Sequence, residues 1–166
     1  MKRIRTSTAL VVLGLAALAL FTATADKNPQ KGKTEQRVVL VAGTDAWTET
    51  DIEIGLKDEV TFTATGKVCF SSAKQSCEGP AGWGRDDYAN SWPDDYNECE
   101  DTMSDANHGA LIGSIGGNLF YIGPKQTVTG KEGILSLGIN DCTFTGEPFG
   151  NSGSFSVVVS IERRGG

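Results

Sequence analysis

Apolar and polar residues alternate along several stretches of this chain, and this period of two limits the folds it can adopt more than any other feature. In "EVTFTATGKVCF", Val60, Phe62 and Ala64 belong to one face and the threonines between them to the other. Two later segments, "ILSLGI" and "SFSVVVSI", place apolar side chains on one face in the same way: Leu135, Leu137, Ile139, Phe155, Val157, Val159 and Ile161. This pattern is typical of half-buried β-strands.

Shorter apolar segments complete the pattern. "RVVLVAG", "TDIEI", "ALIGSIG" and "NLFYIG" are bounded by turn formers such as Gly55, Gly116-Gly117 and Gly123-Pro124. After residue 25, no segment has the i, i+3, i+4, i+7 spacing of an amphipathic helix. We therefore predict an all-β fold, an antiparallel jelly-roll β-sandwich.

The N-terminus has the features of a secretory signal peptide. Lys2, Arg3 and Arg5 precede an apolar run over residues 9–21, and "ATA" at the end of residues 1–25 fits a cleavage site. The apolar run is too short for a membrane span. We expect a secreted or periplasmic product without a membrane span.

One domain follows this segment. Residues 26–36, "DKNPQKGKTEQ", are polar and carry no apolar side chain, so we expect a flexible leader there. Residues 37–164 are enough for a single β-sandwich domain with a hydrophobic core, and too few for two ordinary domains.

The charge of the chain excludes one class of partner. The sequence has 15 basic and 21 acidic residues, and three of the basic residues lie in residues 1–25. The remainder therefore carries 12 basic and 21 acidic residues, a net charge of −9. Nucleic-acid binding requires a basic face, so we expect no nucleic-acid partner.

A long acidic insert interrupts the strand pattern between residues 71 and 108. It contains Trp83, Trp92 and Tyr96 among many Asp, Glu and Gly residues. These aromatic rings either form a platform on which sugar rings stack or pack the insert onto the sandwich. We include the three among the candidate ligand-binding residues.

Four cysteines, Cys69, Cys77, Cys99 and Cys142, indicate an oxidising compartment and two disulfides. The sequence alone leaves three pairings open. Zinc binding by these cysteines is the weaker interpretation, because no C-x-x-C pair is present.

The connection "NDCTFTGEPFGNSG" is much longer than an ordinary hairpin loop and rich in oxygen. It offers side-chain oxygens from Asn140, Asp141, Glu147 and Asn151, the kind of ligand that calcium takes. Asn, Asp, Ser and Gly are also the ordinary residues of turns, so the composition leaves both interpretations open.

Several motifs resemble those of a known lectin family. "VTFTATGKVCF", "HGALIGSIG", "GILSLGIND" and "GNSGSFSVVV" are similar to segments of the PA-IL-like (LecA) galactophilic bacterial lectins. The resemblance covers about residues 38–161. It implies a small jelly-roll sandwich, like a galactose-binding domain, with one calcium ion at the loop ends whose coordination two sugar hydroxyls complete.

The resemblance also implies a ligand set. Asp141 and Asn151 would supply side-chain oxygens to Ca²⁺, and Phe70 and Thr145 would supply backbone carbonyls. Gly150 stands where the family has a further asparagine, and the family's His-Pro-x-Gln motif is absent. The implied ligand is therefore a galactose-like sugar or one of altered specificity.

The same alignment implies a disulfide pairing. Cys99 falls beside Cys142, at the rim of the implied calcium site, so the resemblance favours a Cys99–Cys142 bridge. Cys69–Cys77 would then close the start of the insert. Because Cys142 follows Asp141 directly, we count it among the ligand-binding residues.

These observations favour a non-enzymatic, calcium-binding lectin-like module that recognises carbohydrate or a cell-surface glycan. The alternative is a disulfide-stabilised structural or protein-interaction sandwich that has lost sugar binding. We interpret His108, the only histidine, as a packed or surface residue. The pairs Asp86-Asp87 and Asp94-Asp95 are interpreted as solvated charges rather than as a glycosidase acid and base.

Overall fold

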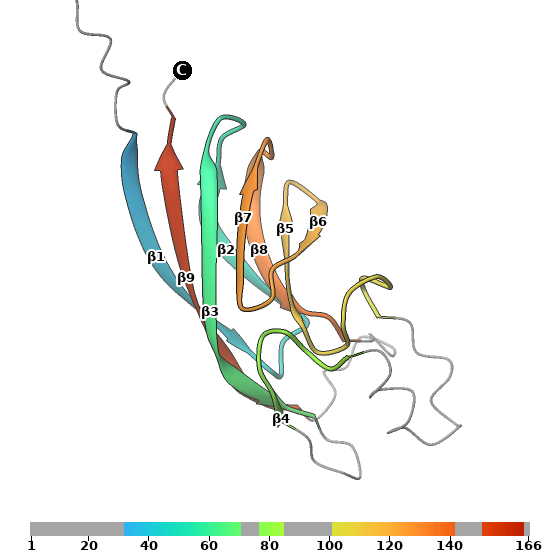
Figure 1. Ribbon diagram of the computed structural model, residues 1–166. Coiled ribbons are helices and arrows are strands. Elements are labelled where there is room, and N and C mark those ends of the chain that lie inside the picture. Colours follow the sequence, from blue (N-terminus) through green and yellow to red (C-terminus); the bar gives the residue numbers. More distant parts are fainter. Residues whose placement is uncertain (1–31, 71–76, 85–100, 142–150, 165–166) are drawn as a thin grey trace, which may run out of the picture. The chain divides into compact units, whose positions relative to one another are not determined.

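The computed structural model describes residues 32–70, 77–84, 101–141 and 151–164, all within one compact unit (Figure 1). The described residues form β-strands and no helix, which confirms the predicted all-β class. None of the described segments is therefore a helix with the length and hydrophobicity of a membrane span. The expected signal peptide, residues 1–25, lies outside the described residues.

The first sheet is built around strand β3, Glu59–Cys69. On one side β3 pairs with β9, Ser152–Arg163, and β9 pairs in turn with the edge strand β1, Lys33–Ala42. On its other side β3 pairs with β7, Lys125–Thr129, near its start and with β4, Cys77–Glu78, near its end. All these pairings are antiparallel.

The second sheet has the strand order β2-β8-β5-β6 and is also antiparallel. Its strands are β2, Trp47–Ile54, β8, Gly133–Ile139, β5, Leu111–Ile115, and β6, Asn118–Tyr121. The two sheets pack face to face as the predicted β-sandwich (Figure 1).

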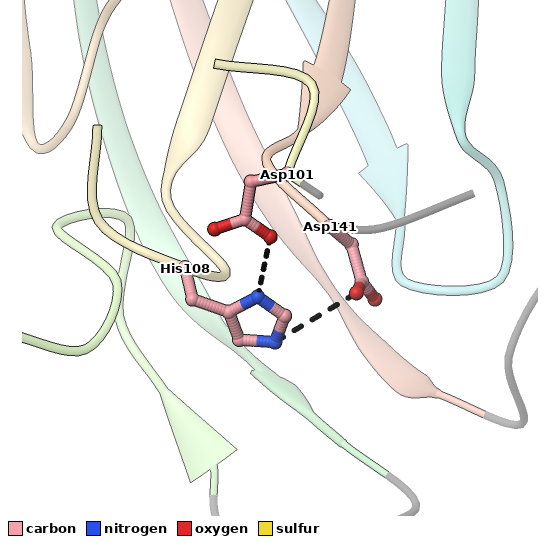
Figure 2. Close-up of side chains that lie close together, drawn as sticks. All are labelled: Asp101, His108 and Asp141. Carbon is pink, nitrogen blue, oxygen red and sulfur yellow. Dashed lines mark hydrogen bonds and ion pairs between the residues drawn. The ribbon is translucent and has the colours of Figure 1, made fainter. Parts of the chain in front are cut away.

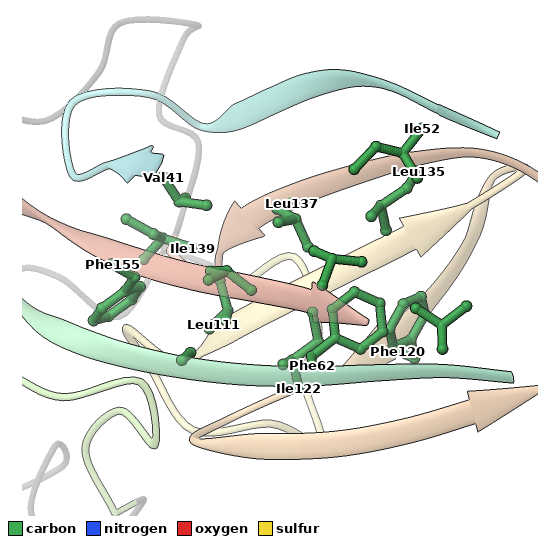
Figure 3. Packing of buried hydrophobic residues seen from close by; sticks show 14 of the residues in the cluster. Val41, Ile52, Phe62, Leu111, Phe120, Ile122, Leu135, Leu137, Ile139 and Phe155 are labelled. Carbon is green, nitrogen blue, oxygen red and sulfur yellow. The ribbon is translucent and has the colours of Figure 1, made fainter. Parts of the chain in front are cut away.

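The core lies between the inner faces of these sheets. Phe62 and Phe155 from the first sheet and Leu111, Leu135 and Leu137 from the second are fully buried in one cluster (Figure 3). The alternation seen in the sequence is confirmed, because the residues predicted on the apolar faces of β3, β8 and β9 are all buried. Thr63 and Thr65, between the buried positions of β3, are exposed.

Strand β1 begins inside the segment expected to be a leader. Residues 33–36 pair with residues 160–163 of β9, starting at Lys33 opposite Arg163. Residues 33–36 have no apolar side chain that would indicate a strand. Backbone pairing holds this end of β1, and its side chains lie at the surface. The ordered domain thus starts before residue 37.

One of the implied disulfides is present. Cys69 and Cys77 are bonded and face each other in the register of β3 and β4. This bridge attaches the start of the insert to the end of the central strand. Cys99 and Cys142 lie outside the described residues, so the second bridge stays a prediction.

Candidate metal and ligand site

Segments that are distant in sequence meet at one end of the sandwich. The antiparallel register places Cys69 opposite Ser152, so that Phe70 and Asn151 continue from neighbouring strands. In the second sheet, β5 and β8 pair up to Ile139, and the chain before β5 lies beside the chain that leaves β8. The residues of the candidate site lie at this end, where paired strands of both sheets terminate.

Asn140 joins these segments from inside. Its side chain is fully buried, and its Oδ1 accepts a hydrogen bond of 2.8 Å from the backbone N–H of Met103. Its Nδ2 lies 3.0 Å from the carbonyl oxygen of Met103, 3.3 Å from that of Ala106 and 3.1 Å from that of Asn107. Asn140 thereby fixes the turn over residues 103–107 against the end of β8.

Aromatic rings enclose His108. The Trp83 ring stacks nearly parallel to the imidazole, with ring centroids 5.5 Å apart and planes inclined by 5°. The Phe70 ring lies 5.3 Å from His108 and 4.8 Å from Trp83. Gly109 allows the Phe70 ring to lie against the main chain next to His108, because a Cβ at residue 109 would come within 2.5 Å of that ring. The φ of Gly109, +73°, is also one that glycine adopts readily. The orientation of the imidazole is therefore fixed by packing.

Two carboxylates flank the imidazole of His108 (Figure 2). Asp101 Oδ1 lies 2.8 Å from Nδ1, and Asp141 Oδ1 lies 3.7 Å from Nε2. The imidazole is 2% exposed, whereas the side chains of Asp101 and Asp141 are 17% and 18% exposed. The cluster is thus closed on the side of the histidine and open to solvent at its acids.

Asn151 completes the cluster. Its Nδ2 donates a hydrogen bond of 2.8 Å to Asp141 Oδ2. The main chain of Asp141 is held as well, because its N–H donates to the carbonyl of Ile139 and its carbonyl accepts from the hydroxyl of Thr102 at 3.4 Å. The carboxylate of Asp141 is consequently presented in one orientation.

This arrangement has the chemistry of a metal site. Asp101, His108 and Asp141 each offer one ligand atom, and these atoms lie within 4.8 Å of one another. Carboxylate oxygens and imidazole nitrogens are common ligands of divalent metal ions. The acids also bring negative charge to a partly exposed rim, where a cation would offset it.

The structure brings together two of the four residues that the family resemblance implied as calcium ligands. Asp141 and Asn151 are in direct contact. The Phe70 ring packs against the His108 ring, whereas the role implied for Phe70 belongs to its backbone carbonyl. Thr145 lies outside the described residues. The roles of these four as ligands stay predictions.

Trp83 is the one predicted ligand-binding residue that the structure describes. It packs on Phe70 and His108, and its indole N–H donates to Glu78 Oε1 at 2.6 Å. The contacts of its ring thus follow the packing interpretation at this position. Trp92, Tyr96 and Cys142 lie outside the described residues.

Sequence reasoning missed two members of the cluster. His108 was interpreted as a packed or surface residue, and it is packed, but it also contacts both acids. Asp101 was one of many acidic residues in the insert and had no distinguishing spacing. The only histidine precedes β5, and Asn140-Asp141 directly follow its neighbour β8, but this proximity is apparent only once the pairing of β5 with β8 is known.

Comparison with known proteins supports the fold. Neither a protein-family model nor a curated protein matches the sequence. A solved structure described as the EclA N-terminal domain, a PllA-like lectin, superposes with a TM-score of 0.53 at 19% identity. The match covers 75% of this chain and 95% of the other. The chain therefore has a lectin-like β-sandwich fold.

Proposed function

We propose that this protein is an exported, non-enzymatic carbohydrate-binding module that recognises sugar hydroxyls beside a divalent cation. The binding site is the loop end of the sandwich that carries Asp141. The observation that supports this most directly is the convergence of Asp101, His108, Asp141 and Asn151 from separate segments on one partly exposed point. The lectin-like fold adds support, because the similar structure is described as a lectin.

A metal ion at this point suits carbohydrate recognition physically. A divalent ion that has few protein ligands keeps open coordination positions, which water or a sugar diol fills. Calcium is the ion that the family resemblance implies, with Asp141 and Asn151 as side-chain ligands and Phe70 and Thr145 as carbonyl ligands. Galactose-like sugars on cell surfaces are the corresponding ligand class.

The arrangement of His108 fits a binding role better than a catalytic one. Both of its nitrogens face carboxylates, and its ring is enclosed by Trp83 and Phe70. A general base needs a nucleophile within hydrogen-bond reach. This environment supports a binding role for the imidazole rather than a role as a general base.

A glycan array tests the proposal. The purified protein is applied with Ca²⁺, with Zn²⁺ and with EDTA, alongside the variants Asp141→Asn and Asp105→Asn. Asp105 is an exposed acid of the neighbouring turn, so its variant changes the net charge equally without touching the cluster. We expect a glycan signal that requires a metal ion, survives Asp105→Asn and is lost in Asp141→Asn. Silence under all three conditions would contradict carbohydrate binding.

Protein interaction is the second candidate function, and one surface feature favours it. Val38 and Leu40 are 71% and 64% exposed on the outer face of β1. Among the described residues β1 pairs only with β9, and it forms the edge of its sheet (Figure 1). An edge strand with exposed apolar side chains is a site where another chain can add a strand. A silent glycan array together with concentration-dependent association in sedimentation would favour this function.

A further inference from the structure

The hydrogen bond between His108 and Asp101 determines which nitrogen of the imidazole faces Asp141 without a proton in the neutral ring. An ionised carboxylate only accepts hydrogen bonds, so the 2.8 Å contact with Asp101 Oδ1 places a proton on His108 Nδ1. In the neutral imidazole the other nitrogen, Nε2, then carries the lone pair. Nε2 is the atom that faces Asp141. A histidine whose Nδ1–H is held by a carboxylate and whose Nε2 binds the ion is a recurrent arrangement of metal sites.

The second ligand is oriented in the same manner. Asn151 Nδ2 donates to Asp141 Oδ2, and this hydrogen bond turns Oδ1 towards the imidazole. Each candidate ligand thus has an orienting partner of its own. Asp101 positions His108, and Asn151 positions Asp141.

The separation of the two facing atoms is compatible with a shared metal ion. His108 Nε2 and Asp141 Oδ1 are 3.7 Å apart, which exceeds the usual N–H···O length of about 2.7 to 3.2 Å. Two tetrahedral zinc ligands, each about 2.0 to 2.1 Å from the ion, lie about 3.4 Å from one another. A closure of about 0.3 Å would bring both atoms onto one zinc ion, and two calcium ligands at about 2.4 Å can lie 3.7 Å apart without closure, so the type of ligand atom has to distinguish the ions.

The nitrogen ligand discriminates between metals. Calcium takes oxygen ligands, whereas imidazole suits zinc and its first-row neighbours. His108 is buried and packed against Trp83 and Phe70 with its Nε2 towards Asp141, so the described residues offer a nitrogen at this point. The described residues consequently favour an ion that accepts nitrogen.

We propose that the site binds Zn²⁺, or a similar nitrogen-accepting divalent ion, through His108 Nε2 and Asp141 Oδ1. Asp101 is a positioning residue that acts through His108. Further groups, water and ligand hydroxyls among them, complete the coordination. The inference rests on the metal site of the proposed function and replaces the calcium implied by the family resemblance with another ion.

The competing interpretation needs no metal. A protonated His108 would donate from both nitrogens and act as a cationic bridge between Asp101 and Asp141. Metal binding at neutral pH distinguishes the two arrangements, because a metal-bound Nε2 carries no proton.

Metal titration of the intact protein tests the proposal. After EDTA treatment and dialysis, Zn²⁺, Ca²⁺ and Co²⁺ are each titrated in a calorimeter at pH 7, and Co²⁺ binding is also followed by its visible absorption. We expect one Zn²⁺ per chain, much weaker binding of Ca²⁺, and a Co²⁺ spectrum that indicates nitrogen and oxygen ligation. His108→Gln is expected to abolish Zn²⁺ binding and the Co²⁺ absorption.

Asp101→Asn separates positioning from folding and keeps the test valid if His108→Gln does not fold. The asparagine oxygen still accepts from Nδ1 but has lost its charge, so Zn²⁺ affinity should fall by about tenfold. Its melting temperature without metal should stay close to that of the Asp105→Asn control. Unchanged Zn²⁺ affinity in both His108→Gln and Asp101→Asn would overturn the inference.

The outcomes also separate this inference from the proposed function. Stoichiometric Ca²⁺ binding without Zn²⁺ binding would overturn the zinc assignment and leave a metal-dependent carbohydrate site standing. If neither ion binds, the metal assignment is wrong. Zn²⁺ binding with a silent glycan array would support the zinc site and contradict the carbohydrate function.

Discussion

Replacing Asn140 with alanine should destabilise the site end of the sandwich far more than an ordinary surface substitution does. The change removes the acceptor of the Met103 N–H and the donor shared by the carbonyls of Met103, Ala106 and Asn107. A net hydrogen bond contributes about 1 kcal/mol, and a buried polar group left without a partner costs about 1 to 3 kcal/mol. The Asn140 side chain can make three of these hydrogen bonds at one time, one through Oδ1 and two through the two hydrogens of Nδ2. We therefore expect a loss of about 2 to 3 kcal/mol in the free energy of unfolding.

Urea unfolding followed by tryptophan fluorescence, in the presence of EDTA, measures this loss without a contribution from bound metal. Asn118→Ala is the matched control, because Asn118 makes one side-chain bond, of 3.3 Å, to the Ile115 carbonyl. Its expected loss is below about 1 kcal/mol. For a domain of this size, the Asn140→Ala loss corresponds to a fall in Tm of about 10 °C. Equal losses in Asn140→Ala and Asn118→Ala would refute the structural role assigned to Asn140.

Two further predictions concern stability. Replacing Cys69 and Cys77 together by alanine should lower the free energy of unfolding by about 2 to 3 kcal/mol, because the bridge closes a short loop in the unfolded chain. Urea titration measures this loss, and an unchanged unfolding midpoint would contradict the prediction. Burial raises the pKa of Asp58, but hydrogen bonds from the Gly55 amide and the Arg163 guanidinium outweigh it and hold that pKa below its ordinary 3.8. The Asp58 carboxylate therefore stabilises the fold above about pH 4, and its contribution is lost as the pH falls through the lowered folded-state pKa. Asp58→Asn should show a smaller loss of stability between pH 5 and pH 2 than the unsubstituted protein, measured by thermal melts; parallel curves would contradict this.

The strands and their inner faces were predictable because the pleat imposes a local rule. Successive side chains point to opposite sides, so Val60, Phe62 and Ala64 identify the buried face of β3 without knowledge of any partner. The start of β1 at Lys33 escaped prediction for the converse reason. Backbone pairing with β9 holds that end, and pairing leaves no signature in side-chain polarity.

The residues of the site also differ in whether the sequence alone indicated them. The oxygen-rich stretch around Asp141 and Asn151 was visible in the sequence, and the resemblance to lectins placed both residues at one point. Asp101 and His108 had no such signal, because an acid and a histidine seven positions apart in an irregular insert have no defined geometry until other segments enclose them. Their position beside Asp141 arises from β5 pairing with β8 and from the buried side chain of Asn140. Local periodicity therefore specifies strands and their faces, whereas a cluster drawn from separate segments exists only once long-range pairing has brought those segments together.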